Sequence, residues 1–170
     1  MKNCNSSFLG LFCLVLGYQV SAQDPGIRVG SMAPAILLPT PKGDTVALSS
    51  IHAKLVLIDF WASWCAPCVQ EQPELKNLYA KYGALNLSEK TFEIFGVSLD
   101  SKKQAWQKAI KKYHIPWTQV SDLKFWMSPV AKAYHIEELP FNVLLDSKGI
   151  IVAVNLHGIQ LEEFIKKYLK

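Results

Sequence analysis

The 170-residue chain carries little charge and no marked excess of either sign. Charged residues make up 19% of it, and its 18 basic and 14 acidic residues are spread along the chain without a dense basic stripe. Neutralising the phosphates of nucleic acid needs such a stripe, so we expect no nucleic-acid partner. Half of the residues are hydrophobic, which excludes a disordered chain and suffices for the core of one domain.

Cysteines and long hydrophobic runs are scarce too. The chain has four cysteines, too few for a disulfide-framework domain, and its charge-free stretch 8–22 is shorter than the roughly 20 apolar residues that span a bilayer. Lys2 precedes this stretch, and the small residues Val20 and Ala22 precede a break after Ala22. The pattern predicts a signal peptide over residues 1–22, with an uncleaved membrane-tethering segment as the alternative.

The order of hydrophobic patterns along residues 23–170 predicts one α/β domain. Residues 54–60 and 92–99 are apolar in consecutive positions, which is typical of strands covered by helices on both faces. Apolar spacing of three and four predicts a helix over 66–82, kinked at Pro73. Further strands are expected at 35–38, 45–48, 117–120, 141–146 and 150–155, and further helices at 101–113, 129–134 and 160–169. Such an order favours a sandwich with a mixed sheet.

Two cysteines, Cys65 and Cys68, stand where the first buried strand gives way to the kinked helix. The unpaired N–H groups and the positive dipole end of the first helical turn favour a thiolate at Cys65, so its pKa should lie below the free value of about 8.5. Cys68 should be shielded one turn inside, and Pro67 fits the first turn without loss of a hydrogen bond. Cys65 could then attack a substrate disulfide, and Cys68 could resolve the mixed disulfide, or the reverse.

Two other uses of this cysteine pair are a structural disulfide and a zinc site. A bridge that closes so short a loop restricts the unfolded chain little. Zinc commonly needs about four ligands, and the candidates His52, His114, His135 and His157 lie far apart without paired spacing. We therefore expect no metal, nucleotide or flavin site, and we assign the histidines no catalytic role.

The chain resembles the thioredoxin superfamily, and within it the secreted TlpA-like and ResA-like thiol-disulfide oxidoreductases with a redoxin or AhpC/TSA-like domain. The resemblance covers nearly all of residues 23–170. Its motifs are Val29-Gly30-Ser31-Met32-Ala33-Pro34, Trp61-Ala62-Ser63-Trp64-Cys65-Ala66-Pro67-Cys68 and Asp146-Ser147-Lys148-Gly149. It implies a three-layer α/β/α fold with an added N-terminal β-hairpin, and a redox-active Cys65–Cys68 disulfide at the surface as the sole redox group.

Two acidic residues match functional positions of these proteins. Asp59, six residues before Cys65, matches a buried acid that takes part in proton transfer with the second thiol. Burial in the strand would raise the pKa of Asp59 toward neutrality, whereas a strand-end aspartate that reaches water is the alternative. Glu71 matches a glutamate near the active site of ResA-like proteins, although an exposed helical glutamate would look the same.

Other matching positions concern substrate binding. Pro140 matches a cis-proline that faces the two sulfurs and leaves the backbone of Leu139 free to pair with an extended substrate segment. Many relatives have Thr after this proline, where this chain has Phe141-Asn142, so the groove should differ in detail. Trp64 and Pro67 flank the sulfurs as further contacts. Trp61 could equally belong to the core, and the remaining tryptophans are expected there: Trp106, Trp117 and Trp126.

The dipeptide Ala66-Pro67 supplies no cationic donor, unlike the Pro-His pair of strongly oxidising relatives, which favours a reductase or isomerase of client proteins. The resemblance implies a membrane or envelope thiol protein as electron donor, and a location in the periplasm or cell envelope. A thiol peroxidase of the peroxiredoxin type is a second candidate, but Ala62 and Ile58 replace the Thr or Ser and the Pro of that chemistry. A non-catalytic binding module with this fold is the third.

Overall fold

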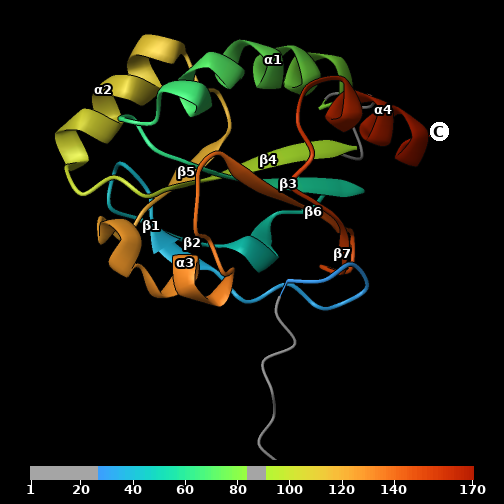
Figure 1. Cartoon of the computed structure of the whole chain (residues 1–170), viewed down its shortest axis with the longest axis horizontal. Helices are drawn as coiled ribbons and strands as arrows, with labels where there is room; N and C mark the ends of the chain where they lie inside the picture. Colours follow the sequence, from blue (N-terminus) through green and yellow to red (C-terminus); the bar gives the residue numbers. More distant parts are fainter. Residues whose placement is uncertain (1–26, 84–90) are drawn as a thin grey trace, which may run out of the picture.

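The computed structural model describes residues 27–83 and 91–170 of the chain (Figure 1). The predicted signal peptide, residues 1–22, lies outside this range. Among the helices of the described part, none combines the length and the apolar character needed to cross a membrane.

A five-stranded mixed sheet forms the centre of the domain, with strand order β5-β4-β3-β6-β7. The parallel strands are β3 (Leu55–Trp61), β4 (Phe92–Ser98) and β5 (Thr118–Val120). The antiparallel strands at the other edge are β6 (Phe141–Asp146) and β7 (Ile151–Val154). Every residue of β3 and β4 is buried, as their consecutive apolar residues predict.

Helices and a small hairpin cover the two faces of this sheet, which confirms the expected three-layer sandwich (Figure 1). One face carries α1 (Ala66–Tyr82), α2 (Lys103–Tyr113) and α4 (Gly158–Tyr168). The other carries α3 (Pro129–Ala133) and an antiparallel hairpin of β1 (Leu37–Pro39) and β2 (Thr45–Ala47). Two short 3-10 turns complete the described elements, η1 (Leu48–Ser50) and η2 (Phe125–Met127).

Alternation along β3 divides the core into two layers. Leu57 and Trp61 pack on the face beneath α1, whereas Ile58 and Phe60 pack on the face toward α3 and the hairpin. Because successive strand residues point to opposite faces, the same alternation directs Asp59 toward α1. The sheet thus brings a carboxyl group under the helix that begins next to Cys65.

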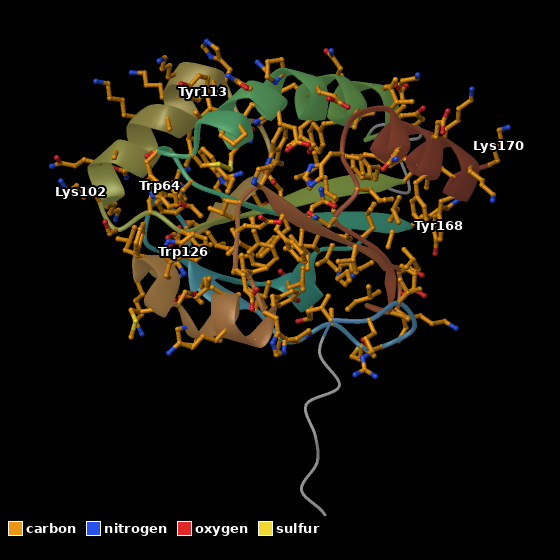
Figure 2. All side chains as sticks on the ribbon, viewed as in Figure 1. Trp64, Lys102, Tyr113, Trp126, Tyr168 and Lys170 are labelled. Carbon is orange, nitrogen blue, oxygen red and sulfur yellow. A yellow bond between two sulfur atoms is a disulfide. The ribbon has the colours of Figure 1, made fainter. Side chains whose placement is uncertain are left out.

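The tryptophans differ in how far they are buried. Trp61, Trp106 and Trp117 are buried, so the expected core role holds for the last two. Trp126 is only partly buried, but it packs against the buried cluster on the hairpin side of the sheet, so the expected core role holds in part. It lies in η2, where its ring also packs 6.1 Å from the ring of Trp64 (Figure 2).

Candidate active site

Cys65 and Cys68 form a disulfide at the N-terminus of α1, with their Cα atoms 5.3 Å apart. Cys65 is the N-cap of the helix, and its Sγ accepts a hydrogen bond from the backbone N–H of Cys68 at 3.2 Å. The sulfur therefore meets the unpaired donors of the first turn, which favour negative charge there. Pro67 lies in this turn, as its lack of a donor allows.

The two cysteines differ in exposure less than the sequence suggests. In the disulfide form Cys65 is 5% exposed and Cys68 is 1% exposed, so both are largely buried, although Cys65 is the more accessible. The exposed surface of the motif belongs instead to Trp64, Ala66 and Pro67, which surround the N-cap. These three side chains form the exposed surface around the sulfur of Cys65.

A buried aspartate fixes the turn that leads into the motif. The carboxylate of Asp100 accepts hydrogen bonds from the backbone N–H of Ser63 at 2.9 Å and from its hydroxyl at 2.5 Å. It also accepts one from the hydroxyl of Ser98 at 2.8 Å, and Asp100 is 1% exposed. The sequence analysis missed this residue. Parallel strands end at one edge of a sheet, so an aspartate just after β4 was a usable signal.

The floor of the site is held by a contact between β3 and β5. The indole Nε1 of Trp61 donates a hydrogen bond to Oε1 of Gln119 at 2.8 Å inside the core. Gly96 on the strand between them makes room, since a Cβ there would lie 2.0 Å from Nε2 of Gln119. Trp61 belongs to the same buried cluster as both cysteines, so this contact fixes the surface on which they rest.

Asp59 is 3% exposed, so the alternative of an aspartate that reaches water is wrong. Burial above all, and then the negative charge of Glu71, raise the pKa of Asp59 to about 7. A hydrogen bond from Gln72 and the charge of His157 act in the opposite direction. Oδ2 of Asp59 meets no hydrogen-bond partner in the described part of the chain. A carboxyl group in this state can both take up and release a proton near neutral pH.

Gln72 connects Asp59 with the second cysteine. It lies on α1 one turn after Cys68, it is 1% exposed, and its Nε2 donates to the carbonyl oxygen of Cys68 at 3.5 Å. Because the same side chain hydrogen-bonds Asp59, it spans the space between the acid and the helix. Helical spacing of four from Cys68 was the sequence signal for this missed residue.

Glu71 is bound by a histidine from a distant part of the chain. Oε1 of Glu71 lies 2.6 Å from Nδ1 of His157, and the exposed fractions of the two side chains are 11% and 33%. The hydrogen bond to Glu71 raises the pKa of His157. Glu71 is thus not the exposed glutamate of the alternative interpretation. The sequence alone gives the histidines no catalytic role, and it does not reveal that His157 contacts Glu71, which lies 86 residues away in the chain.

The expected substrate-binding residues lie at the same edge of the sheet. The Leu139–Pro140 peptide bond is cis, as expected, and both residues are partly buried just before β6. The strand register pairs Phe141 with Phe60, which places Pro140 level with the end of β3 that leads to Cys65. In the described ranges, no cluster of three or more histidine, cysteine or acidic side chains could hold a metal ion.

An exposed aromatic cluster adjoins Cys65. Trp64 is 48% exposed, and its ring centroid lies 5.2 Å from that of Phe125 and 6.1 Å from that of Trp126 (Figure 2). We call Trp64, Phe125 and Trp126 the aromatic cluster. Its members come from two segments of the chain that sequence patterns do not connect.

Comparisons with known proteins agree with this geometry. The model of the AhpC/TSA family matches residues 29–154. The thiol-disulfide oxidoreductase ResA of Bacillus subtilis (strain 168) is 31% identical over 165 residues, which cover 95% of this chain and 87% of ResA. A thiol-disulfide oxidoreductase from Bacteroides fragilis NCTC 9343 superposes with a TM-score of 0.74 and 37% identity, over 81% of this chain and 98% of that one. The thioredoxin domain of a thiol-disulfide oxidoreductase from Bacteroides vulgatus gives 0.75 and 35%, over 85% and 100%.

The raised pKa of Asp59 predicts a pH-dependent cost to stability. Its folded pKa of about 7 exceeds the ordinary aspartate value of 3.8, so the acid destabilises the fold progressively as the pH rises from about 4 to 7. We expect Asp59→Asn to stabilise the oxidised protein by about 4 kcal/mol at pH 8 and to have no such effect below pH 4, at about 1.4 kcal/mol per pKa unit. Urea unfolding at several pH values measures the difference. Asp44→Asn, in an exposed turn, is the control, and a gain for Asp59→Asn that is equal at pH 4 and pH 8 would contradict the assignment.

Proposed function

Since the chain belongs to the AhpC/TSA family and is a thioredoxin-like thiol-disulfide oxidoreductase, we propose that it reduces disulfides of client proteins outside the cytoplasm. The observation that carries this proposal is the position of the Cys65–Cys68 pair, with one sulfur at a helix N-terminus and a buried acid beneath. These features provide a stabilised thiolate, a second thiol and a proton acceptor. Disulfide exchange requires those three groups.

The reaction begins with the reduced pair. The Cys65 thiolate attacks one sulfur of the client disulfide, the S–S bond of the client breaks, and its other sulfur leaves as a thiolate that takes a proton from water. A bond now joins Cys65 to the client. Cys65 acts first because its sulfur accepts the N–H of Cys68 and is the more accessible of the two.

Resolution of this mixed disulfide needs a proton acceptor inside the domain. The Asp59 carboxylate takes the proton of Cys68, and the new thiolate attacks Cys65, forms the internal disulfide and releases the second client thiolate. Two electrons have then passed from the dithiol to the client. A pKa of about 7 suits Asp59 to this step, because the acid is ionised in part at neutral pH and releases its proton afterwards.

The direction of electron flow follows from the residues between the cysteines. Ala66 and Pro67 are exposed and apolar, so the Cys65 thiolate receives support from the helix N-terminus without a cationic side chain between the cysteines. A less stabilised thiolate gives a more reducing pair. Such a reductase must be reduced again after each turnover, and we assign that step to a thiol protein of the membrane or cell envelope.

The client binds over the exposed part of the motif. Trp64 and Pro67 flank Cys65, and the segment at Leu139 and Pro140 lies at the same edge of the sheet. We assign to the aromatic cluster the binding of an apolar stretch next to the disulfide of the client, since exposed aromatic rings bury large areas at little cost in conformational entropy. The backbone at Leu139 would pair with the same stretch in extended form.

Residues 1–22 direct the protein out of the cytoplasm in this proposal, and residues 23–170 form the working domain. The pattern of Lys2, a charge-free stretch and small residues at its end supports cleavage after Ala22. The periplasm or cell envelope is the corresponding compartment. Retention of the N-terminal segment as a membrane tether would place the domain on the same side of the membrane.

Replacement of the second cysteine should trap clients. In Cys68→Ser the Cys65 thiolate still attacks, but no thiol resolves the mixed disulfide, so covalent complexes should accumulate in cells. Non-reducing gels and mass spectrometry would detect and identify them. The matched variant Cys65→Ser should form few, because Cys68 is 1% exposed. Equal trapping by both variants would refute the assignment of Cys65 as the attacking residue.

The reduction potential tests the direction of electron flow. After equilibration with glutathione or dithiothreitol buffers, we expect a potential nearer about −270 mV than about −120 mV. Pro67→His should make the potential less negative, because an imidazolium at this exposed position stabilises the thiolate. A wild-type value near that of strong oxidants would show that the protein oxidises its clients.

The aromatic cluster should matter for protein clients alone. Trp64→Ala should raise KM for a disulfide-bonded protein by about tenfold, as expected for loss of an exposed aromatic contact of 1–2 kcal/mol. Turnover of oxidised glutathione should stay unchanged, because so small a substrate does not reach the cluster. Leu37→Ala removes a still more exposed apolar side chain, from the hairpin, and serves as control. A parallel loss on both substrates would disprove client binding by Trp64.

A further inference from the structure

His157 lies beside the active site in a segment that hydrogen bonds hold in place. It lies between β7 and α4, and α4 lies next to α1 on one face of the sheet (Figure 1). The segment that carries it is tied to β6, because Nδ2 of Asn142 donates to the carbonyl of Leu156 at 2.6 Å and Oδ1 accepts its N–H at 3.1 Å. Asn142 is buried and pairs with Asp59 in the strand register. One strand pair thus positions both the acid and the histidine.

Both nitrogens of the His157 ring face oxygen atoms. Nδ1 lies 2.6 Å from Oε1 of Glu71, and Nε2 lies 2.9 Å from Oδ1 of Asn155. A carboxylate and an amide oxygen are acceptors, and an imidazole has two N–H donors only when it is protonated. The contacts therefore favour the positively charged ring. As N-cap of α4, His157 makes no side-chain capping bond within the described residues, so the ring is not used to begin the helix.

The charges that face His157 are acidic. They come from Glu71 and Glu74 on α1 and from Asp59 on β3, and all three raise the pKa of His157. Glu162 of α4 is close enough to Glu74 to affect it, but it is paired with Lys81 at 2.6 Å. Glu71 also affects Asp59, because its negative charge disfavours ionisation of that acid. The positive charge of His157 has the opposite effect and favours it. His157 thus neutralises the group that opposes ionisation of the acid.

We propose that His157 is a positioning residue for disulfide exchange, which binds and neutralises Glu71 so that Asp59 stays able to accept the proton of Cys68. The proposal rests on the proton-acceptor role given to Asp59 above. His157 takes no proton from the reacting atoms. Without the positive charge of His157, the bare carboxylate of Glu71 holds Asp59 in its protonated form, and a protonated acid accepts nothing from Cys68.

The test follows the resolving step as a function of pH. Reduced protein is mixed with oxidised glutathione, and release of the second glutathione thiol is timed from pH 5 to pH 9. We expect His157→Gln to move the midpoint of this rate up by about one pH unit, the usual effect of one nearby charge, and to slow the step by up to about tenfold at pH 7. Glu71→Gln removes the opposing charge and should move the midpoint down.

Opposite shifts from two residues in contact distinguish this role from a structural one, because loss of packing would not change sign. His52→Gln alters an exposed histidine on the segment before β3 and should leave the midpoint in place. Alkylation of Cys65 in the Cys68→Ser background should be unaffected by His157→Gln. An unchanged midpoint in His157→Gln, or shifts of the same sign in His157→Gln and Glu71→Gln, would overturn the proposal.

The Asp59→Asn background separates failure of this inference from failure of the proposed function. Asp59→Asn alone should slow resolution, and addition of His157→Gln should then cause no further change. If Asp59→Asn leaves the resolving rate intact, the proton-acceptor role itself is wrong. If it slows resolution but His157→Gln still shifts the midpoint in that background, His157 acts by another route and the inference falls.

Discussion

The site depends on one carboxyl group buried beneath the start of a helix. Asp59 lies between Leu57 and Trp61 on the face of β3 that packs under α1, in a position that a hydrophobic residue would fill at lower cost. Ionisation of this acid is opposed by burial and by Glu71, and is supported by Gln72 and His157. The balance of these four effects brings the pKa of Asp59 near the pH at which thiols exchange.

The side chains that hold the site in place differ from those that are exposed around Cys65. Asp100 holds the turn before the motif, Gln119 holds Trp61, and Asn142 holds the segment before α4, through hydrogen bonds of side chains that are themselves buried. The side chains to which we assign client binding, above all Trp64, are exposed. Under the proposed function, the preorganised interior fixes the reacting groups and recognition is left to a few surface side chains.

Much of the fold could be predicted because its signals are local. Seven consecutive buried positions in β3 and β4 read as apolar runs, and the helix after the motif begins and ends at the predicted residues, Ala66 and Tyr82. Prediction was incomplete where burial depended on a neighbour. Trp126 packs against the core but also on Trp64 at the edge of the site, and Cys65 was expected to be more exposed than it is in the disulfide.

The sequence by itself determined the chemistry: two cysteines at a strand-to-helix transition, an acid six residues earlier on the inner face, and a proline before a later strand. These features follow from spacing, since strand and helix periods convert sequence distance into direction. Only the tertiary structure decided what surrounds them. Glu71 meets His157 across 86 residues, and Gln119 finds room over Gly96, because the order of strands in the sheet brings these segments together. No local period encodes that order, so the groups that adjust the acidity of Asp59 are invisible until the sheet is assembled.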